Sequence, residues 1–348
     1  MPDLQKAHDK LIDFLTSTYT HDLLQRKGAT YPVTIFTPTP EQQNDPDSIL
    51  SVDYPSEFSD PATFAFYDSD HLNNLLTTRP GQTNGITYDM HSIATNPLKV
   101  EACLGHFFDG LATSDALDHE LRDFAQGKRN DLPHREKLHG VVSKDEVIAN
   151  GAGRSAIIGA AMLTVFNHNG AYRAIFVRRS KNLATGAGLY HIAPAFVFQP
   201  VGPQSYHPQE WSMKHQCMRE YAEELFAMPE FADWHNLGSA RYFYQHPAIV
   251  DLQAMLDDGR AALYLTGIAV NFLSARPEIC TLLIIHDENW YTRSEQKLKA
   301  ALFTERQETH YIPINTLQGL PDNLHTSMAP QGAAAFWLGI DKARAEIG

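Results

Sequence analysis

Apolar residues recur along the chain with two spacings, and each spacing predicts a type of secondary structure. Near the start, Leu4, Ala7, Leu11 and Leu15 lie at the spacing that is typical of one face of an amphipathic helix. Short unbroken apolar runs between turn-forming residues are typical of buried strands instead. On this basis we expect helices over residues 4–25, 100–125, 209–227 and 294–303, and from residue 331 onward. We expect strands over residues 31–37, 61–67, 157–166, 172–178, 240–244, 264–273 and 279–286.

Two of these strands form a predicted hairpin. The apolar runs 157–166 and 172–178 are separated by a short polar segment that contains Asn169 and Gly170. Asn-Gly between such runs is the strongest short signal for a tight hairpin turn, because both residues tolerate a positive φ. An extended segment, a helix, further strands and a final helix follow. That order indicates a mixed sheet with helices packed on it, so we predict an α/β (α+β) fold class.

A polar segment, QGKRNDLPHREKLHG at residues 126–140, marks a change in the character of the chain. The pattern before it mixes helix and strand without a catalytic motif, whereas the pattern after it is the strand-rich order described above. We therefore predict an N-terminal α/β domain over residues 1–140 and a second domain over residues 141–348. The role of the first is open; covering a substrate, dimerising and binding a partner all fit.

Composition narrows the class of protein. The chain has 348 residues, with 28 Lys and Arg against 41 Asp and Glu, for a formal net charge of −13. This balance argues against binding to long nucleic acids, although a local pocket can still be basic. The three cysteines lie far apart and indicate reduced thiols. The chain has neither a signal-peptide pattern nor an apolar run of about 18 residues, so we expect a cytoplasmic protein without membrane contact.

The segment Arg219-Glu220-Tyr221-Ala222-Glu223-Glu224 carries the most chemical information. On a helix, at about 100° per residue, Glu220, Glu223 and Glu224 share one face. Their mutual repulsion would modestly destabilise the helix, and a hard divalent cation would remove that cost. Arg219 is placed to reach Glu223 one turn later. We therefore expect a Mg²⁺ or Mn²⁺ site on these three glutamates, with Arg219 supporting it.

This segment resembles the signature of the Nudix hydrolases, in which Arg-Glu-x-x-Glu-Glu lies on a metal-binding helix. The context is also similar, because a hairpin ending in Arg178 and Arg179 precedes the helix and Pro330 leads into a last helix. The resemblance covers about residues 150–348. It implies a Nudix-like α/β/α sandwich that hydrolyses a nucleoside diphosphate linked to another group.

The chain departs from the signature at three positions. The family's upstream glutamate falls on Trp211, with Glu210 one position away, and its first glycine falls on Ser205, with Gly202 nearest. A one-residue insertion and a longer loop would let Glu210 and Gly202 serve instead. The final glycine falls on Phe226, so we expect the helix to continue to Pro229.

The resemblance implies a role for each candidate residue. Glu220, Glu223 and Glu224 would hold the metal and Arg219 would join them in the catalytic set, whereas Arg178 or Arg179 would bind a phosphate oxygen. An additional carboxylate from a late segment, either Glu278 or Glu308, would assist. The expected partner is a small nucleotide-type substrate, and a homodimer is compatible with the pattern.

Two other interpretations stay open. A charged run such as residues 219–224 also fits an exposed, solvated helix face in a structural or interaction protein. Alternatively, the departures from the signature fit a catalytically weakened module that binds a nucleotide or metabolite and acts through the N-terminal domain. A metal-dependent hydrolysis assay separates these interpretations.

Overall fold

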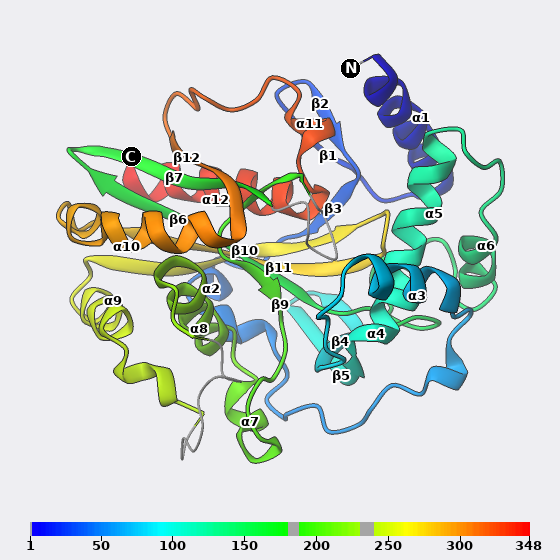
Figure 1. The fold of residues 1–348 in the computed structure, drawn as a ribbon, viewed down its shortest axis with the longest axis horizontal. Helices are drawn as coiled ribbons and strands as arrows, with labels where there is room; N and C mark the ends of the chain where they lie inside the picture. The colour runs from blue at the N-terminus through cyan, green and yellow to red at the C-terminus, as the bar shows by residue number, and fades with distance from the viewer. Residues whose placement is uncertain (1, 180–187, 230–239) are drawn as a thin grey trace.

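The computed structural model describes residues 2–179, 188–229 and 240–348, and its centre is a mixed sheet of eight strands (Figure 1). Six strands follow the order β12-β7-β6-β11-β10-β3, while β8 pairs with β7 and β9 pairs with β6. Strands β6 and β11 are parallel and the other pairs are antiparallel. The strands are β3 (Val33–Phe36), β6 (Gly159–His168), β7 (Ala171–Arg179), β8 (Tyr190–Ile192), β9 (Ala195–Val197), β10 (Ala261–Asn271), β11 (Arg276–Ile285) and β12 (Arg306–Pro313).

Helices cover both faces of this sheet. Alternate residues of β6 point to opposite faces, as the two-residue period of a strand requires. Ala161, Leu163 and Val165 pack in one core cluster with α12 (Pro330–Ile347). Ala160, Met162 and Phe166 pack in the other cluster, with α8 (Met213–Phe226), α9 (Pro247–Asp257) and α10 (Trp290–Glu305). The predicted mixed α/β fold class is therefore confirmed.

The N-terminal part of the chain adds to the same sheet and the same core. Its strand β3 pairs with β10 at the sheet edge. The hairpin of β4 (Ile86–Thr95) and β5 (Leu98–His106) is bridged to residues 150 and 157. Side chains from both parts, such as Tyr88 and Ile158, belong to one core cluster. The boundary expected near residue 140 lies just after α6 (Pro133–His139) and does not divide this core.

Two buried arginines connect the segment around the expected boundary to the turn between β10 and β11. Arg135 on α6 donates hydrogen bonds to the Tyr19 hydroxyl at 2.7 Å and to the Leu273 carbonyl at 2.6 Å. Arg154 donates to the Ala275 carbonyl at 2.7 Å and to the Val147 carbonyl at 2.8 Å. Because a buried guanidinium is costly unless its donors are bonded, these contacts fix the N-terminal part against the sheet.

Four sequence-based elements differ from the structure. The first helix, α1 (Pro2–Thr18), is shorter than expected, and β1 (Leu24–Arg26) pairs with β2 (Ala29–Tyr31). Residues 100–106, expected to begin a helix, belong instead to β5 (Leu98–His106), which pairs with β4. Residues 61–67 and 240–244 are not strands: each contributes a short 3-10 helix, Pro61–Thr63 and Tyr242–Gln245.

The remaining helices are short or lie in the N-terminal part. In Figure 1, α1 and α5 run side by side at one end of the molecule, and contacts between them agree with that view. The helices not yet named are α2 (Pro40–Gln43), α3 (Ser69–Thr78), α4 (Phe107–Gly110), α5 (Ala116–Ala125), α7 (His207–Glu210) and α11 (Leu324–Ser327). A π-helical turn at Leu111–Asp115 lies between α4 and α5. None of the described helices has the length and apolar character needed to cross a bilayer.

A glycine in α12 allows this helix to lie close to the sheet. A Cβ added at Gly339 would lie 2.6 Å from Leu163 Cδ2 and 2.9 Å from its Cβ. We expect Gly339→Ala to lower the free energy of unfolding by about 1–3 kcal/mol, because it overpacks this contact. Urea unfolding measures the change. Gly85→Ala is the matched control, since no atom lies within 4 Å of a Cβ there, and an equal effect in both variants would contradict the explanation.

Candidate functional site

Helix α8 positions the residues of the Arg-Glu-x-x-Glu-Glu segment. The helix begins after Ser212, whose hydroxyl accepts a hydrogen bond from the His215 amide at 3.1 Å. It ends at Phe226, and Ala227 follows in the left-handed region with φ 52° and ψ 35°. The expectation that the helix continues to Pro229 is therefore wrong. The left-handed turn that the signature assigns to a glycine occurs one residue later, on an alanine.

Arg219 connects two of the three glutamates. Its guanidinium lies 2.7 Å from Glu220 Oε1 and 2.8 Å from Glu223 Oε2, and it donates to Gln216 Oε1 at 2.6 Å. Arg219 and Glu220 are both buried. Burial alone lowers the pKa of Arg219, but the two carboxylates outweigh burial and the net shift is upward. The segment is thus a buried ion cluster, and the alternative of a solvated helix face does not describe it.

Glu224 points to a different place from the other two glutamates. Both of its carboxylate oxygens accept from the Ala195 amide, each at 3.3 Å, so it holds the start of β9 against α8. Glu220 and Glu223 line a cavity that Glu224 does not line. Among the residues that the structure describes, no three His, Cys, Asp or Glu side chains are placed to hold one metal ion. Of the three predicted metal ligands, the structure therefore brings only Glu220 and Glu223 to the same cavity.

The structure brings together the two residues that were expected to replace the missing signature positions. Glu210, at the end of α7, is fully buried and accepts from the Gly202 amide at 3.1 Å and from the Val201 amide at 3.4 Å. Burial raises the pKa of Glu210, and these two backbone donors act against that shift. These hydrogen bonds hold the loop that precedes α8, and Val201 and Gly202 of that loop line the cavity.

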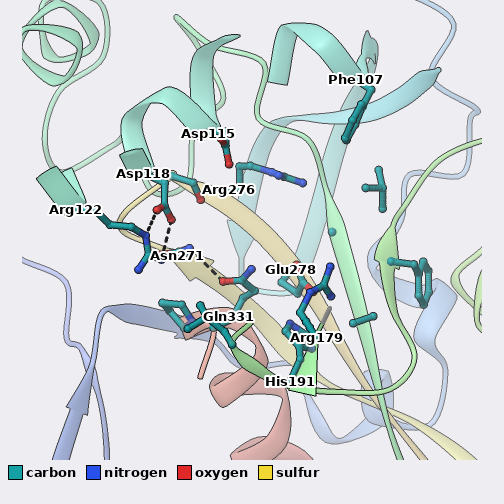
Figure 2. Close-up of a pocket in the computed structure, with 18 of the residues that line it drawn as sticks. Phe107, Asp115, Asp118, Arg122, Arg179, His191, Asn271, Arg276, Glu278 and Gln331 are labelled. Carbon is teal, nitrogen blue, oxygen red and sulfur yellow. Dashed lines mark hydrogen bonds and ion pairs between the residues drawn. The ribbon is translucent and has the colours of Figure 1, made fainter. Parts of the chain in front are cut away.

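Two adjoining cavities open beside α8 and the neighbouring end of the sheet. The first, which we call the carboxylate cavity, has a volume of about 550 Å³ and is lined by Arg219, Glu220 and Glu223. The second, the arginine cavity, has a volume of about 500 Å³ and is shown in Figure 2. Its charged lining residues are Arg79, Arg122, Arg179, Arg276, Asp115, Asp118 and Glu278. Gln82, Phe107 and Val197 line both cavities, so the two are neighbours.

Only one of the two predicted phosphate-binding arginines lines these cavities. Arg179, the last residue of β7, lines the arginine cavity. Arg178 precedes it on the strand and therefore projects to the other side. Its guanidinium contacts Glu308 Oε1 at 3.2 Å and donates to the Gly188 carbonyl at 3.1 Å. Strand geometry thus separates the two candidates, and Arg179 is the one beside the cavities.

The positions of the cavities also distinguish the two late carboxylates, Glu278 and Glu308. Glu278 on β11 is buried and lines the arginine cavity, where Figure 2 shows it near Arg179. Burial raises its pKa to about 7, even though Arg276 and Arg179 act in the opposite direction. A Cβ at Gly159 would lie 2.1 Å from Glu278 Oε2, so this glycine makes room for the carboxylate. Glu308 contacts Arg178 and lies outside both cavities.

Sequence reasoning missed the contribution of the N-terminal part to both cavities. Arg79 follows α3, Gln82 lies in the loop after it, and Phe107 begins α4. Asp118 and Arg122 lie on α5, and both face the arginine cavity in Figure 2. No spacing pattern links these residues along the chain. They line the same cavities because the N-terminal part packs over the end of the sheet, and no local pattern in the sequence indicates that packing.

The three cysteines are free thiols, as the sequence predicts. Cys217 and Cys280 are buried, and Cys103 is half-buried. Burial raises the pKa of the Cys103 thiol to about 11 and that of Cys217 to about 12. None of the three lines either cavity.

Comparison with models of known protein families finds no match, and comparison with curated proteins finds none either.

The buried carboxyl group of Glu278 predicts a specific dependence of stability on pH. Its folded pKa of about 7 lies above the usual 4.5, so the folded protein retains the proton over that interval while the unfolded chain loses it. Folding stability is therefore lost as pH rises from about 4.5 to 7, by on the order of 3 kcal/mol. Glu278→Gln removes this loss, so the variant should gain stability relative to the parent across the window.

Urea unfolding at several pH values measures this difference. The control is Glu295→Gln, which changes an exposed glutamate on α10 that contacts Lys299. If the parent and Glu278→Gln show the same pH dependence, the raised pKa of Glu278 is wrong.

Proposed function

We propose that the protein is a divalent-metal-dependent hydrolase of a small molecule that contains a nucleoside diphosphate linkage. The observation that carries this proposal is the adjoining pair of cavities. One presents the carboxylates of Glu220 and Glu223, and the other presents the Arg179 guanidinium and the Glu278 carboxyl group. Cation ligands, an anion ligand and a titratable carboxyl group are thus available to one bound molecule.

The ligands of the carboxylate cavity fit Mg²⁺ or Mn²⁺. Magnesium is usually held by one or two carboxylates together with substrate phosphates, rather than by a complete protein cage. Glu220 and Glu223 supply two carboxylates, which is the number that this mode of binding needs. When bound, the metal would offset phosphate charge and lower the pKa of a water molecule.

The other residues have roles that follow from their positions. Arg219 holds Glu220 and Glu223 in fixed orientations, since it contacts both within 2.8 Å. Arg179 offers the planar donor geometry that matches phosphate oxygens. Glu278 accepts a proton from water as a general base, and its pKa of about 7 is near the value that makes a base effective at neutral pH.

A second candidate is a binding or sensor module without hydrolytic turnover. The observation in its favour is the pairing of both cavity glutamates with Arg219, which already offsets much of their charge. In that case the N-terminal residues around the cavities would signal to a partner whether a ligand is bound. The two candidates differ in one measurable property, the metal-dependent release of phosphate-containing products.

The test uses the intact protein with Mg²⁺ or Mn²⁺ and a panel of nucleotide sugars, dinucleotides and nucleoside triphosphates. We expect diphosphate cleavage that Glu223→Gln reduces by at least about 100-fold, since it removes a charged ligand of the metal. The variant should remain folded because Arg219 keeps its contact with Glu220. Product release is measured by chromatography.

Glu295→Gln is the matched control, because it also neutralises a helical glutamate but lines neither cavity. It should retain parental turnover. Turnover that is unchanged in Glu223→Gln would contradict the metal site. Tight binding of a panel member without any cleavage would favour the sensor module instead.

A further inference from the structure

The proposed function assigns roles to Arg179 and Glu278 but none to Arg276, the first residue of β11, which lines the same cavity. The Nε of Arg276 donates a hydrogen bond to the Ile157 carbonyl at 3.1 Å, and its side chain is half-buried. Within the described part of the chain, Arg276 forms no ion pair. One edge of its guanidinium group is therefore fixed by the protein, while the terminal amino groups are available to an anion in the cavity.

The register of the sheet places Arg276 beside Glu278. The two residues are two apart on β11, so their side chains project from the same face of the sheet, about 7 Å apart. Both lean toward β6, which runs parallel to β11 with Gly159 opposite Glu278. Arg276 contacts the Ile157 carbonyl, and the Glu278 carboxyl group fills the space above Gly159. The two side chains therefore lie side by side over the beginning of β6.

Arg179 approaches the same carboxyl group from β7, which lies on the other side of β6. Figure 2 shows the Arg179 side chain next to Glu278. Arg276 and Arg179 both act to lower the pKa of Glu278 against the larger effect of burial, so both lie within electrostatic reach of it. Two arginines thus act on one buried carboxyl group, one from its own strand and one from across β6.

The turn between β10 and β11 holds the backbone of Arg276 in place. Arg154 donates two hydrogen bonds to the carbonyl of the preceding residue, Ala275, at 2.7 and 3.2 Å. Asn271 pairs with Arg276 across the two strands, lines the same cavity and donates to Gln331 on α12 at 3.1 Å. Arg276 therefore projects from a fixed position, and a side chain that is already positioned loses less freedom when it binds a ligand.

Two guanidinium groups that flank one carboxyl group fit a ligand with two adjacent anionic groups, which is what a diphosphate is. We propose that Arg276 is a second phosphate-binding residue, and that Arg179 and Arg276 each bind one phosphate of a diphosphate lying beside Glu278. This inference rests on the proposed function, which brings a diphosphate to this cavity. The two arginines also offset the repulsion between the phosphates and the ionised form of Glu278.

The test measures the binding of inorganic pyrophosphate and inorganic phosphate to the intact protein by titration calorimetry. A chelator is present and no metal is added, so binding is measured separately from hydrolysis. Pyrophosphate can contact both arginines at once, whereas phosphate can be bound by either one alone. We therefore expect the parent to bind pyrophosphate at least about tenfold more tightly than phosphate.

Arg276→Met should weaken pyrophosphate binding by at least about tenfold and phosphate binding by only about twofold, because Arg179 remains. Arg276→Lys keeps the charge but loses the planar fork, so its preference for pyrophosphate should be intermediate. Arg173→Met is the matched control, since Arg173 is a half-buried strand residue of β7 that lines neither cavity. It should keep the parental preference.

Circular dichroism and unfolding curves check that each variant is folded. A parental preference for pyrophosphate in both Arg276 variants would overturn the inference, and so would a parent that does not prefer pyrophosphate to phosphate. If Arg276→Met does not fold, Arg276→Lys decides alone by the same criterion.

The outcomes for the two proposals are separate. A preference that Arg276→Met abolishes supports the second phosphate-binding residue, even if no compound is hydrolysed with Mg²⁺ or Mn²⁺ and the hydrolase function fails. Conversely, metal-dependent hydrolysis by a protein whose pyrophosphate binding does not depend on Arg276 would leave the hydrolase function standing and overturn the role of Arg276.

Discussion

The candidate site depends on one buried ion cluster. Arg219 could not be buried on α8 without the carboxylates of Glu220 and Glu223, because an unpaired guanidinium inside a protein is strongly destabilising. The same helix turns Tyr221 into the core, where its hydroxyl accepts a hydrogen bond from Trp290 Nε1 at 2.9 Å. The helix is therefore fixed on one side by packing and on the other by ion pairs, and this fixes the direction in which Glu220 and Glu223 face.

The sheet supplies the second half of the arrangement. Strands β6 and β11 are parallel and begin at the same end of the sheet, where Gly159 leaves space for Glu278. Strand β7 ends there too, which places Arg179 beside that carboxyl group. The N-terminal part then packs over this end of the sheet, and the two parts share one core cluster. The result is a pair of cavities, one lined by the carboxylates of Glu220 and Glu223 and the other by four arginines and three carboxyl groups.

Much of the fold was predictable from the sequence, because it depends on local patterns. The turn at Asn169 and Gly170 has a positive φ at both residues, as the Asn-Gly signal requires. The spacing around Arg219 correctly predicted a helix, although only Glu220 and Glu223 of its three glutamates line the same cavity. By contrast, residues 100–106 were expected to begin a helix but lie in β5, because Val100 and Leu104 lie four apart and can satisfy either period.

The site was predictable only where one local segment builds it. Arg178 and Arg179 are equivalent in the sequence, and only the pleat of β7 shows which of them faces the cavity. Arg79 follows α3 and Arg122 lies on α5, and both line the arginine cavity through long-range packing, so no spacing could connect them. Glu224 illustrates the reverse problem: the helix pattern placed it with the metal ligands, but the start of β9 lies within reach of its carboxylate and binds it.

We propose that Glu220 and Glu223 form a divalent-metal site despite their contacts with Arg219. Titration of the intact protein with Mn²⁺, followed by electron paramagnetic resonance of the free ion, tests it most directly. We expect saturable binding that weakens by at least about tenfold in Glu220→Gln/Glu223→Gln and is unchanged in Glu295→Gln. Equal Mn²⁺ binding by the parent and the double variant would contradict it.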